Sequence, residues 1–388
     1  MKPHAEAAIA MPRSGIREVM ELAAGKEGLI KLHVGEPSFR TPLHIIEAAM
    51  QAARDGHTRY TANAGTPALR AAVAARYTPR YGYEVSPEEV LIGTGAVNAI
   101  GPMLFSLIHD GDEVLVPDPG WPNYQGQVTL ARGASVVYPL RAEHGWLPQT
   151  ADLEALVTGR TKVLILNNPS NPCGVVWPKA TVQAVMAWAE RHDLWVITDE
   201  IYEDLIYDGE FVPAAPFGRE RTIAIGGCSK SYAMTGWRIG WAIAPRDLTA
   251  LAAKVQEGIV SCPADVSQSA ALAALTGPQA CVEEMRAAYE RRRDLVREML
   301  APAGLLPTVP EGAFYAMIDF RELGMPSREV VRMLIQEEGV TLAPGTAFGQ
   351  QAEGMARMSL ASSDEELQAG CERIVAFASR HAKAGAVA

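Results

Sequence analysis

Lys230 is the residue whose type and surroundings point most directly to covalent chemistry. It lies in a polar segment just beyond the apolar run Thr222–Ile225. Because burial disfavours a charged amine, a lysine held between apolar segments is expected to lose its proton more easily and to form a Schiff base with a carbonyl compound. Ser229 and Arg238 flank it, and a hydroxyl with a guanidinium is suited to binding phosphate. The competing interpretation, an ordinary surface lysine, fits this setting less well.

A glycine-containing turn, Gly93–Asn98, predicts a second binding feature at the start of a helix. It follows the apolar run Val90–Ile92 and reads Gly-Thr-Gly-Ala-Val-Asn. Glycines at a helix start let backbone N–H groups approach an anion, and the helix dipole strengthens the attraction. A dinucleotide site needs Gly or Ala where Asn98 stands, and an acidic residue at the end of the next strand, which is missing here. A small phosphate site is therefore favoured over NAD, with a simple tight turn as the alternative.

Two more polar segments follow apolar runs of the kind that form buried strands. Asp199 follows Leu194–Thr198, with Tyr202 three residues later, and Asn171 lies in a proline-rich turn after Lys162–Leu166. The Asp199 carboxylate could pair with a cationic group of a ligand or cap a helix, and both interpretations stay open. The turn around Asn171 is first of all rigid, but its amides can donate to a ligand oxygen. Open α/β sheets bind ligands outside the carboxyl ends of their strands, which is where all these segments stand.

The elements that must position these residues follow from an alternation of apolar runs and helical patterns, which is typical of βαβ units. The expected strands are Val90–Ile92, Glu113–Val116, Ser135–Tyr138, Lys162–Leu166, Leu194–Thr198, Thr222–Ile225 and Gly240–Ala244. The expected helices between them are Asn98–Leu107, Tyr124–Ala131, Asp152–Val157 and Lys179–Arg191. The runs lack clean polar alternation, as expected when helices cover both faces of a parallel sheet. We therefore predict an α/β fold with a large domain over residues 39–280.

From about Pro278 the pattern changes to that of a smaller α+β domain, built from residues 1–38 and 281–388. Its expected elements are the helix Cys281–Leu300, the strand Ala313–Phe320, the helix Ser327–Glu338 and a last helix from Asp364 to about Ala382. An N-terminal helix, Gly15–Ala24, is expected to pack against this domain or a partner chain. The run Arg291–Arg293 is expected to form a solvated helix face.

Composition excludes several classes of function. Lys and Arg number 35 against 45 Asp and Glu, the net charge is −10, and no block of basic residues occurs, which argues against nucleic-acid binding. The longest nearly apolar stretch, Ala99–Ile108, is far shorter than the about 20 residues of a membrane helix. The 5 cysteines are scattered, histidines lack ligand spacing, and Met1–Ser14 has no secretory pattern. We expect no metal, free thiols and a cytoplasmic location.

Five motifs in this order carry a family resemblance. They are Gly35-Glu36-Pro37, Asn168-Pro169-x-Asn171-Pro172-x-Gly174, Asp199-Glu200-x-Tyr202, Ser229-Lys230-x-x-x-Met234-Thr235-Gly236-Trp237-Arg238 and Ala356-Arg357-Met358-Ser359. Over nearly its whole length the chain resembles the class I/II aminotransferases of the fold-type-I pyridoxal-phosphate enzymes, and especially the aspartate/aromatic aminotransferase-like subgroup. The fold this implies is a mostly parallel seven-stranded sheet with helices on both faces, plus the smaller α+β domain.

The resemblance implies a bound pyridoxal 5'-phosphate, attached to Lys230 as a Schiff base, with Lys230 then acting as general base and acid. It implies that Asp199 pairs with the pyridinium nitrogen and keeps it protonated. Asn171 and Tyr202 are expected to bind the phenolic oxygen, and Trp121 to stack on the ring. The phosphate is expected to be bound by Gly95, Ala96, Val97, Ser229 and Arg238.

The resemblance also implies how substrate and a second subunit take part. Arg357 would hold the substrate α-carboxylate in a bidentate fork. The full set of expected substrate contacts is Gly35, Trp121, Asn171 and Arg357. Tyr60 matches the tyrosine that similar enzymes insert into the neighbouring subunit's phosphate site, which implies a homodimer with shared active sites. The alternative for Tyr60 is a core aromatic before the expected helix Leu69–Arg76.

One departure from the subgroup bears on the substrate. Aspartate-accepting members commonly carry a lysine, which binds the distal carboxylate, where this chain has Val97. No arginine stands between Gly258 and Gln268, where other aspartate enzymes place their distal-carboxylate ligand. This shifts the expectation toward neutral, aliphatic or aromatic amino acids, although Arg17, Arg40 or a partner residue could take over that role.

Three functions could use these residues. The favoured one is an aminotransferase that exchanges an amino group between an amino acid and a 2-oxo acid by a ping-pong mechanism. The alternative is a pyridoxal-phosphate-dependent lyase, acting by β-elimination or related chemistry on the same scaffold, which would use largely the same residues. A pyridoxal-phosphate-sensing regulator is disfavoured, because residues 1–38 leave no room for a DNA-binding domain.

Overall fold

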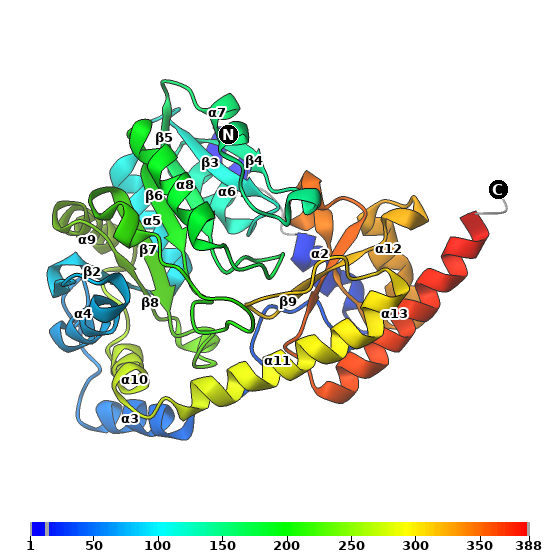
Figure 1. Ribbon diagram of the computed structural model, residues 1–388. Coiled ribbons are helices and arrows are strands. Elements are labelled where there is room, and N and C mark those ends of the chain that lie inside the picture. The colour runs from blue at the N-terminus through cyan, green and yellow to red at the C-terminus, as the bar shows by residue number, and fades with distance from the viewer. Residues whose placement is uncertain (1, 12–14, 386–388) are drawn as a thin grey trace.

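The computed structural model describes residues 2–11 and 15–385. Within this part of the chain the largest sheet has seven strands in the order β2-β8-β7-β6-β5-β3-β4 (Figure 1). These strands are β2 (Val90–Gly93), β3 (Glu113–Asp118), β4 (Ala134–Pro139), β5 (Thr161–Asn167), β6 (Trp195–Asp199), β7 (Thr222–Gly227) and β8 (Gly240–Ile243). β8 runs antiparallel to both of its neighbours, β2 and β7, and the other neighbouring pairs of this sheet are parallel. The predicted mostly parallel seven-stranded sheet is confirmed.

Helices cover both faces of this sheet, as predicted. Successive residues of β5 face opposite sides, since Val163 packs in one apolar cluster and Leu164 in another. Because both sides are buried, the strand is apolar almost throughout. The helices of this larger part are α3 (Leu43–Arg54), α4 (Pro67–Tyr81), α5 (Ala96–Leu107), α6 (Asn123–Leu130), α7 (Thr150–Leu156), α8 (Lys179–Arg191), α9 (Arg246–Val260) and α10 (Asp265–Thr276).

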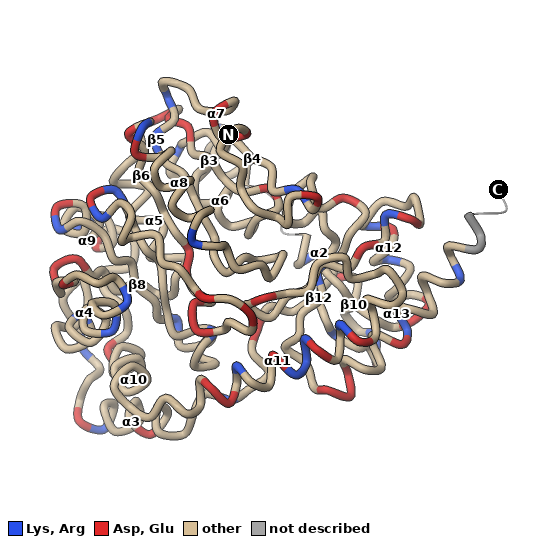
Figure 2. Tube along the Cα trace, viewed as in Figure 1, with Lys and Arg blue, Asp and Glu red and all other residues tan. Residues whose placement is uncertain are grey.

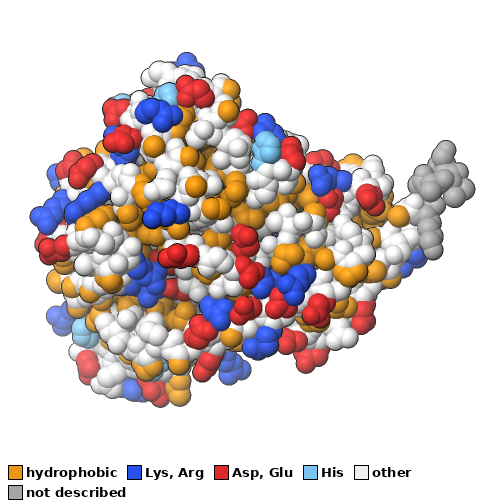
Figure 3. Space-filling view, in the orientation of Figure 1, with side chains coloured by type: hydrophobic (Ala, Val, Ile, Leu, Met, Phe, Trp, Pro, Cys, Tyr) orange, Lys and Arg blue, Asp and Glu red, His pale blue; other side chains and the backbone are white. Residues whose placement is uncertain are grey.

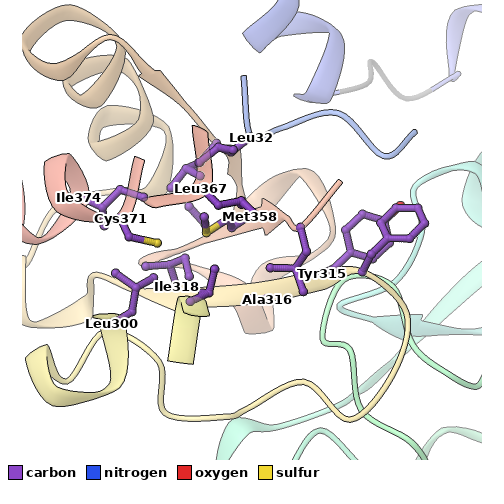
Figure 4. Packing of buried hydrophobic residues seen from close by; sticks show 14 of the residues in the cluster. Leu32, Leu300, Tyr315, Ala316, Ile318, Met358, Leu367, Cys371 and Ile374 are labelled. Carbon is purple, nitrogen blue, oxygen red and sulfur yellow. The ribbon is translucent and has the colours of Figure 1, made fainter. Parts of the chain in front are cut away.

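The long helix α11 (Ala280–Leu300) leads from the larger part into a smaller α+β arrangement (Figure 1). There β9 (Tyr315–Asp319), β11 (Ala343–Pro344) and β12 (Met355–Ser359) form an antiparallel sheet, and β1 (Ile30–Lys31) pairs with β10 (Val340–Thr341) in parallel. The helices are α2 (Gly15–Ala23), α12 (Ser327–Met333) and α13 (Asp364–Gly385), while α1 (Glu6–Ile9) lies against α6. Leu300, Ile318, Met358 and Leu367 pack together in the core of this part (Figure 4).

The predicted N-terminal helix is present as α2, and it packs against the smaller part. Val19 belongs to the same apolar cluster as β9 and α13. Gly15 approaches Ala347 so closely that a Cβ at residue 15 would lie 2.6 Å from that side chain. Residues 1, 12–14 and 386–388 of the predicted smaller domain lie outside the described residues, and the domain boundaries themselves remain a prediction. None of the helices in the described ranges is both long and apolar enough to cross a membrane.

The expectation of a solvated face at Arg291–Arg293 is wrong for two of the three arginines. Arg292 and Arg293 are buried, although charges of both signs are spread along α11 in the charge-coloured trace (Figure 2). Arg292 is paired with Asp364 at 2.9 Å and lies over the Phe39 ring, and Arg293 donates to the Pro310 carbonyl at 2.8 Å. Arginine can be buried when its guanidinium is hydrogen-bonded and its stem packs on apolar surface, which the charge pattern alone does not indicate.

Candidate active site

A cavity of about 390 Å³ lies at the carboxyl ends of the strands of the large sheet and is closed on one side by the smaller part. All of the predicted site residues except Gly95 and Tyr60 line it. The lining residues are Ile16, Val34, Gly35, Glu36, Ala96, Val97, Trp121, Tyr124, Asn167, Asn171, Asp199, Ile201, Tyr202, Ser229, Lys230, Thr235, Arg238, Tyr315 and Arg357. Segments spread over most of the chain therefore meet where an open α/β sheet binds its ligands.

Lys230 stands in the loop after β7 and points into this cavity, so it is not the surface lysine of the competing interpretation. Its Nζ donates a hydrogen bond of 2.9 Å to the carbonyl oxygen of Gly35. The amine also lies 6.0 Å from the ring centre of Tyr202 and 5.6 Å from that of Phe314. The position combines an apolar surround with one polar contact, which leaves the amine accessible to a ligand in the cavity.

Asp199 ends β6 and is buried beside Lys230, with only 4% of its surface exposed. Burial raises the pKa of its carboxyl group, while the Tyr124 hydroxyl, the Ile201 N–H and the charge of Lys230 act in the opposite direction. Tyr124 donates to Oδ2 at 2.6 Å and Ile201 to Oδ1 at 3.3 Å. The helix-capping interpretation is wrong, because a turn and not a helix follows β6. A cationic ligand would offset the burial of this carboxylate.

The start of α5 and the loop after β7 form an anion-binding corner. Gly95 precedes the helix with a φ of +86°, and a Cβ there would lie 2.7 Å from Nη2 of Arg238. Gly240 is equally confined, since its Cβ would lie 2.5 Å from the backbone nitrogen of Ala96. With Ser229 nearby in the lining, the corner joins backbone N–H groups, a guanidinium and a hydroxyl. This is a donor set for a phosphate group, and the simple-turn alternative leaves the guanidinium unexplained.

Arg357 lies in β12 with 1% of its surface exposed, and burial lowers the pKa of its guanidinium. Nη1 donates to Oδ1 of Asn171 at 3.1 Å, and Nη2 donates to the carbonyl oxygen of His33 at 2.7 Å. Within the described ranges its Nε–H has no hydrogen-bond partner and no carboxylate pairs with it. Because arginine offers more donors than are used here, the group can bind a carboxylate in a bidentate manner.

Asn171 connects the two halves of the cavity. Its backbone N–H donates to Oδ1 of Asn167 at 2.7 Å, which fixes the turn after β5. Its side-chain oxygen accepts from Arg357, so its amide N–H₂ is the end that remains to donate to a ligand. The rigid turn predicted from the sequence therefore also carries a donor into the site.

Several lining residues were missed by the sequence analysis. Tyr124, which contacts Asp199, is the last residue of the segment Pro119–Tyr124 and could have been found from its place beside Trp121. Tyr315 and Ile16 gave no signal, because their neighbours are ordinary apolar residues of a strand and a helix. His33 contributes only its backbone oxygen to Arg357, and burial lowers the pKa of its imidazole to about 4.

Tyr60 is the predicted residue that lies apart from the cavity. Its side chain is 92% exposed, and the alternative of a core aromatic is therefore wrong. No metal-binding cluster of His, Cys, Asp and Glu occurs in the described part of the chain.

Comparisons with known proteins agree with this geometry. The model of the family described as aminotransferase class I and II matches residues 27–374. The chain is 39% identical to aromatic-amino-acid aminotransferase 2 of Thermococcus litoralis, over 93% of this chain and 94% of the relative. It is 39% identical to the arginine–pyruvate transaminase of Pseudomonas aeruginosa, over 92% of each chain. Aspartate aminotransferase of Thermus thermophilus, solved with maleate, superposes with a TM-score of 0.93 at 36% identity and covers 97% of this chain and 100% of its own.

Proposed function

Because this chain belongs to the class I and II aminotransferase family and is an aminotransferase, we propose that it uses pyridoxal 5'-phosphate to move an amino group between an L-amino acid and a 2-oxo acid by a ping-pong mechanism. The observation that carries the proposal is the meeting of Lys230, Asp199 and Arg357 in one cavity. Each of the three supplies a different chemistry, and a cofactor with an aldehyde, a basic ring nitrogen and a phosphate needs the first two.

The residues present fit that cofactor. The corner of Gly95, Ala96, Val97, Ser229 and Arg238 would hold the phosphate. Asp199, buried with a raised carboxyl pKa, would gain from a protonated ring nitrogen and would keep it protonated. Trp121 would cover the ring face. Tyr202 would donate its hydroxyl proton to the phenolic oxygen. Asn171 would donate to the same oxygen through its side-chain N–H₂, since its side-chain oxygen accepts from Arg357.

When bound, pyridoxal phosphate supplies an aldehyde that takes the amino nitrogen and a ring that accepts the electron pair from the substrate Cα. Arg357 binds the α-carboxylate and so orients the Cα–H bond. Lys230, whose Nζ has the Gly35 carbonyl as its one hydrogen-bond partner among the described residues, would take the proton from the substrate Cα and return it later in the reaction. Trp121, Tyr315 and the apolar wall exclude water, which protects against hydrolysis.

We propose a preference for neutral, aliphatic or aromatic side chains over aspartate. In the described lining the cationic side chains are Lys230, Arg238 and Arg357, and each already has a proposed task. The remaining wall near the substrate position includes Ile16, Val34 and Val97. A distal carboxylate placed there would lose its hydration without gaining a charged partner. Relatives named for aromatic amino acids, arginine and aspartate show that this family varies its substrates on one fold.

A homodimer and a cytoplasmic location are part of the proposal. Tyr60 supports the dimer, because a large aromatic side chain that is 92% exposed has little to gain from water and would reach a neighbouring subunit's phosphate corner. The lyase alternative has no support from the compared relatives, which are named as aminotransferases or transaminases.

The test is a panel of single amino acids added to purified holoenzyme, followed by a 2-oxo acid. Amino acids with apolar side chains should change the visible absorption of the bound cofactor, and the 2-oxo acid alone should restore it, as a ping-pong mechanism requires. Aspartate should react with a lower kcat/KM than phenylalanine or leucine. A holoenzyme that no amino acid changes, or that reacts only when both substrates are present together, contradicts the proposal.

The substrate preference has its own variant. Val97→Lys should raise kcat/KM for aspartate by about tenfold or more, since a desolvated charge pair contributes roughly 1.5–3 kcal/mol. Val97→Met, similar in length and uncharged, is the control and should not favour aspartate. An equal response of the two variants would show that residue 97 does not face the distal group.

A further inference from the structure

Tyr315 is a buried phenol in the cavity that joins three of the residues described above. It opens β9 with 1% of its surface exposed, and in Figure 4 its ring extends from the strand away from the core residues Leu300, Cys371 and Ile374. Its hydroxyl lies 3.0 Å from that of Tyr202. None of the residue roles proposed so far uses this contact beyond the exclusion of water.

The same side chain fixes two further groups. The guanidinium carbon of Arg357 lies 4.3 Å from the centre of the Tyr315 ring, which orients the plane of the arginine. On its other side the hydroxyl reaches Gly35, where any Cβ would lie 2.6 Å from the phenolic oxygen. Gly35 in turn accepts the hydrogen bond of Lys230. Tyr315 therefore contacts the proposed carboxylate anchor, the proposed ligand of the phenolic oxygen and the peptide that holds the lysine.

The number of protons decides the direction of the bond between the two phenols. Each hydroxyl has one proton to donate. If Tyr202 donates to the cofactor's phenolic oxygen, its proton is used, and the contact with Tyr315 must then be a donation from Tyr315 to Tyr202. The result is a chain from Tyr315 through Tyr202 to the ligand oxygen, in which each hydrogen bond polarises and strengthens the next.

We propose that Tyr315 is a positioning residue that fixes the proton of Tyr202 and the plane of Arg357, and so couples binding of the substrate carboxylate to the hydrogen bond at the cofactor's phenolic oxygen. The inference rests on the proposed function and deepens it. A carboxylate bound to Arg357 neutralises the positive charge over the Tyr315 ring, which weakens Tyr315 as a donor. Tyr202 then becomes a weaker donor in turn, and its hydrogen bond to the phenolic oxygen stabilises negative charge on that oxygen less.

The experiment measures the pH at which the visible absorption of the holoenzyme changes. A weaker hydrogen bond at the phenolic oxygen stabilises the protonated form of the chromophore, so the midpoint should rise. Tyr315→Phe should raise it by about 0.5–1 pH unit, corresponding to the loss of one hydrogen bond. Tyr202→Phe should raise it further, and the double variant should lie close to Tyr202→Phe, because the hydrogen bond that Tyr315 contributes to this chain reaches the ligand oxygen through Tyr202.

A second readout tests the coupling to Arg357. Adding 3-phenylpropanoate, a carboxylate without an amino group, should raise the midpoint of the unaltered holoenzyme, and in Tyr315→Phe this shift should shrink to less than half. In Tyr315→Phe, KM for the amino substrate should rise by a larger factor than kcat falls, because the substitution acts on Arg357, which binds the substrate carboxylate, more than on Lys230.

The matched control is Tyr138→Phe, which removes a buried phenol that donates to the Ile165 carbonyl at 2.8 Å, outside the cavity. It should lower the unfolding temperature about as much as Tyr315→Phe and leave the absorption midpoint and KM unchanged. A Tyr315→Phe enzyme with the midpoint and KM of the unaltered protein overturns the inference while the proposed function stands. An unaltered protein that gives no visible band with pyridoxal phosphate overturns both.

Discussion

Two groups of charged side chains, one buried and one half-buried, lie near the turn after β6, and only the half-buried group is paired within the fold. In the cavity, Asp199 has the nearby Lys230 as its one charged neighbour among the described side chains, and Arg357 has no carboxylate partner among them. Behind the turn, Arg76 contacts Asp204 at 2.6 Å and Arg80 contacts it at 2.8 Å. Burial alone would raise the pKa of the Asp204 carboxyl, but the two arginines overcome this and lower it. For Asp199, burial prevails and the pKa is raised.

The difference distinguishes charges that stabilise the fold from charges that are available to bind a ligand. The paired cluster also supports the unpaired one, because Asp204 follows Tyr202 closely in the same turn. Arg76 further donates to the hydroxyl of Tyr232 at 3.4 Å, near Lys230 in the chain. Removing a paired charge should therefore act on stability, and removing an unpaired one should act on function.

The largest effect is expected from Lys230→Ala. Transamination should fall to the background of the assay, and the visible absorption band and its trapping by borohydride should be lost, because no other amine lines the cavity in the described residues. The unfolding temperature of the cofactor-free protein should stay nearly unchanged. Lys162→Ala, which removes a half-buried surface pair with Asp112, is the control and should keep full activity.

Asp199→Asn should keep the cofactor attached and lower kcat by about 10²–10³-fold, since the ring nitrogen loses its charged partner. In the cofactor-free protein the same substitution should not destabilise the fold at neutral pH. A carboxyl whose pKa is raised on folding stabilises at low pH, and this contribution is lost as the pH rises through the raised value. The asparagine variant should therefore be as stable as, or more stable than, the unaltered apoprotein at neutral pH.

Urea unfolding of both apoproteins between pH 5 and pH 8 measures this effect. Part of the pH dependence should persist in the variant, because burial also raises the pKa of the neighbouring Glu200 to about 8. Two results would remove Asp199 from the group of unpaired charges. One is near-normal turnover of the variant. The other is a loss of stability from acid to neutral pH that is larger in the variant than in the unaltered protein.

The smallest functional effect, and the largest on stability, is expected from Asp204→Ala. Loss of the carboxylate leaves Glu203, 3.5 Å from Arg76 and 2.7 Å from Arg80, as the one remaining carboxylate beside two half-buried arginines, which should cost about 1.5–3 kcal/mol of unfolding free energy. The folded fraction should retain most of its kcat. Asp110→Ala breaks the exposed pair with Arg132 and should leave the unfolding curve unchanged. Equal stability of the two variants would erase the distinction between the regions.

The sheet was predictable from the sequence, because β5 and β6 are buried on both faces and such strands appear as short, continuous apolar runs. Short elements were not, since β10 and β11 span two residues each and owe their pairing to the chain around them. The residues of the cavity could be identified where motifs carried them, as with Asn171. Tyr315 could not, because a tyrosine in an apolar strand is usually part of a core, and only the folded chain brings it to Tyr202.

Burial of the arginines on α11 marks a further limit. Arg292 pairs with Asp364, 72 residues away, and Arg293 pairs with Asp208, 85 residues away, and no local pattern encodes such distant partners. On the face shown in Figure 3, side chains of both signs are intermixed over the surface, so a charge run in the sequence does not by itself indicate exposure.

The confined glycine before α5 has a practical consequence for retargeting the enzyme. Every replacement of Gly95 adds a carbon atom that strains a φ of +86° and displaces the Arg238 guanidinium. A mutant library should therefore keep Gly95 and vary residue 97 instead. There Val97 lines the cavity, and changes in the size and charge of its side chain keep the backbone N–H that residue 97 would contribute to the phosphate corner.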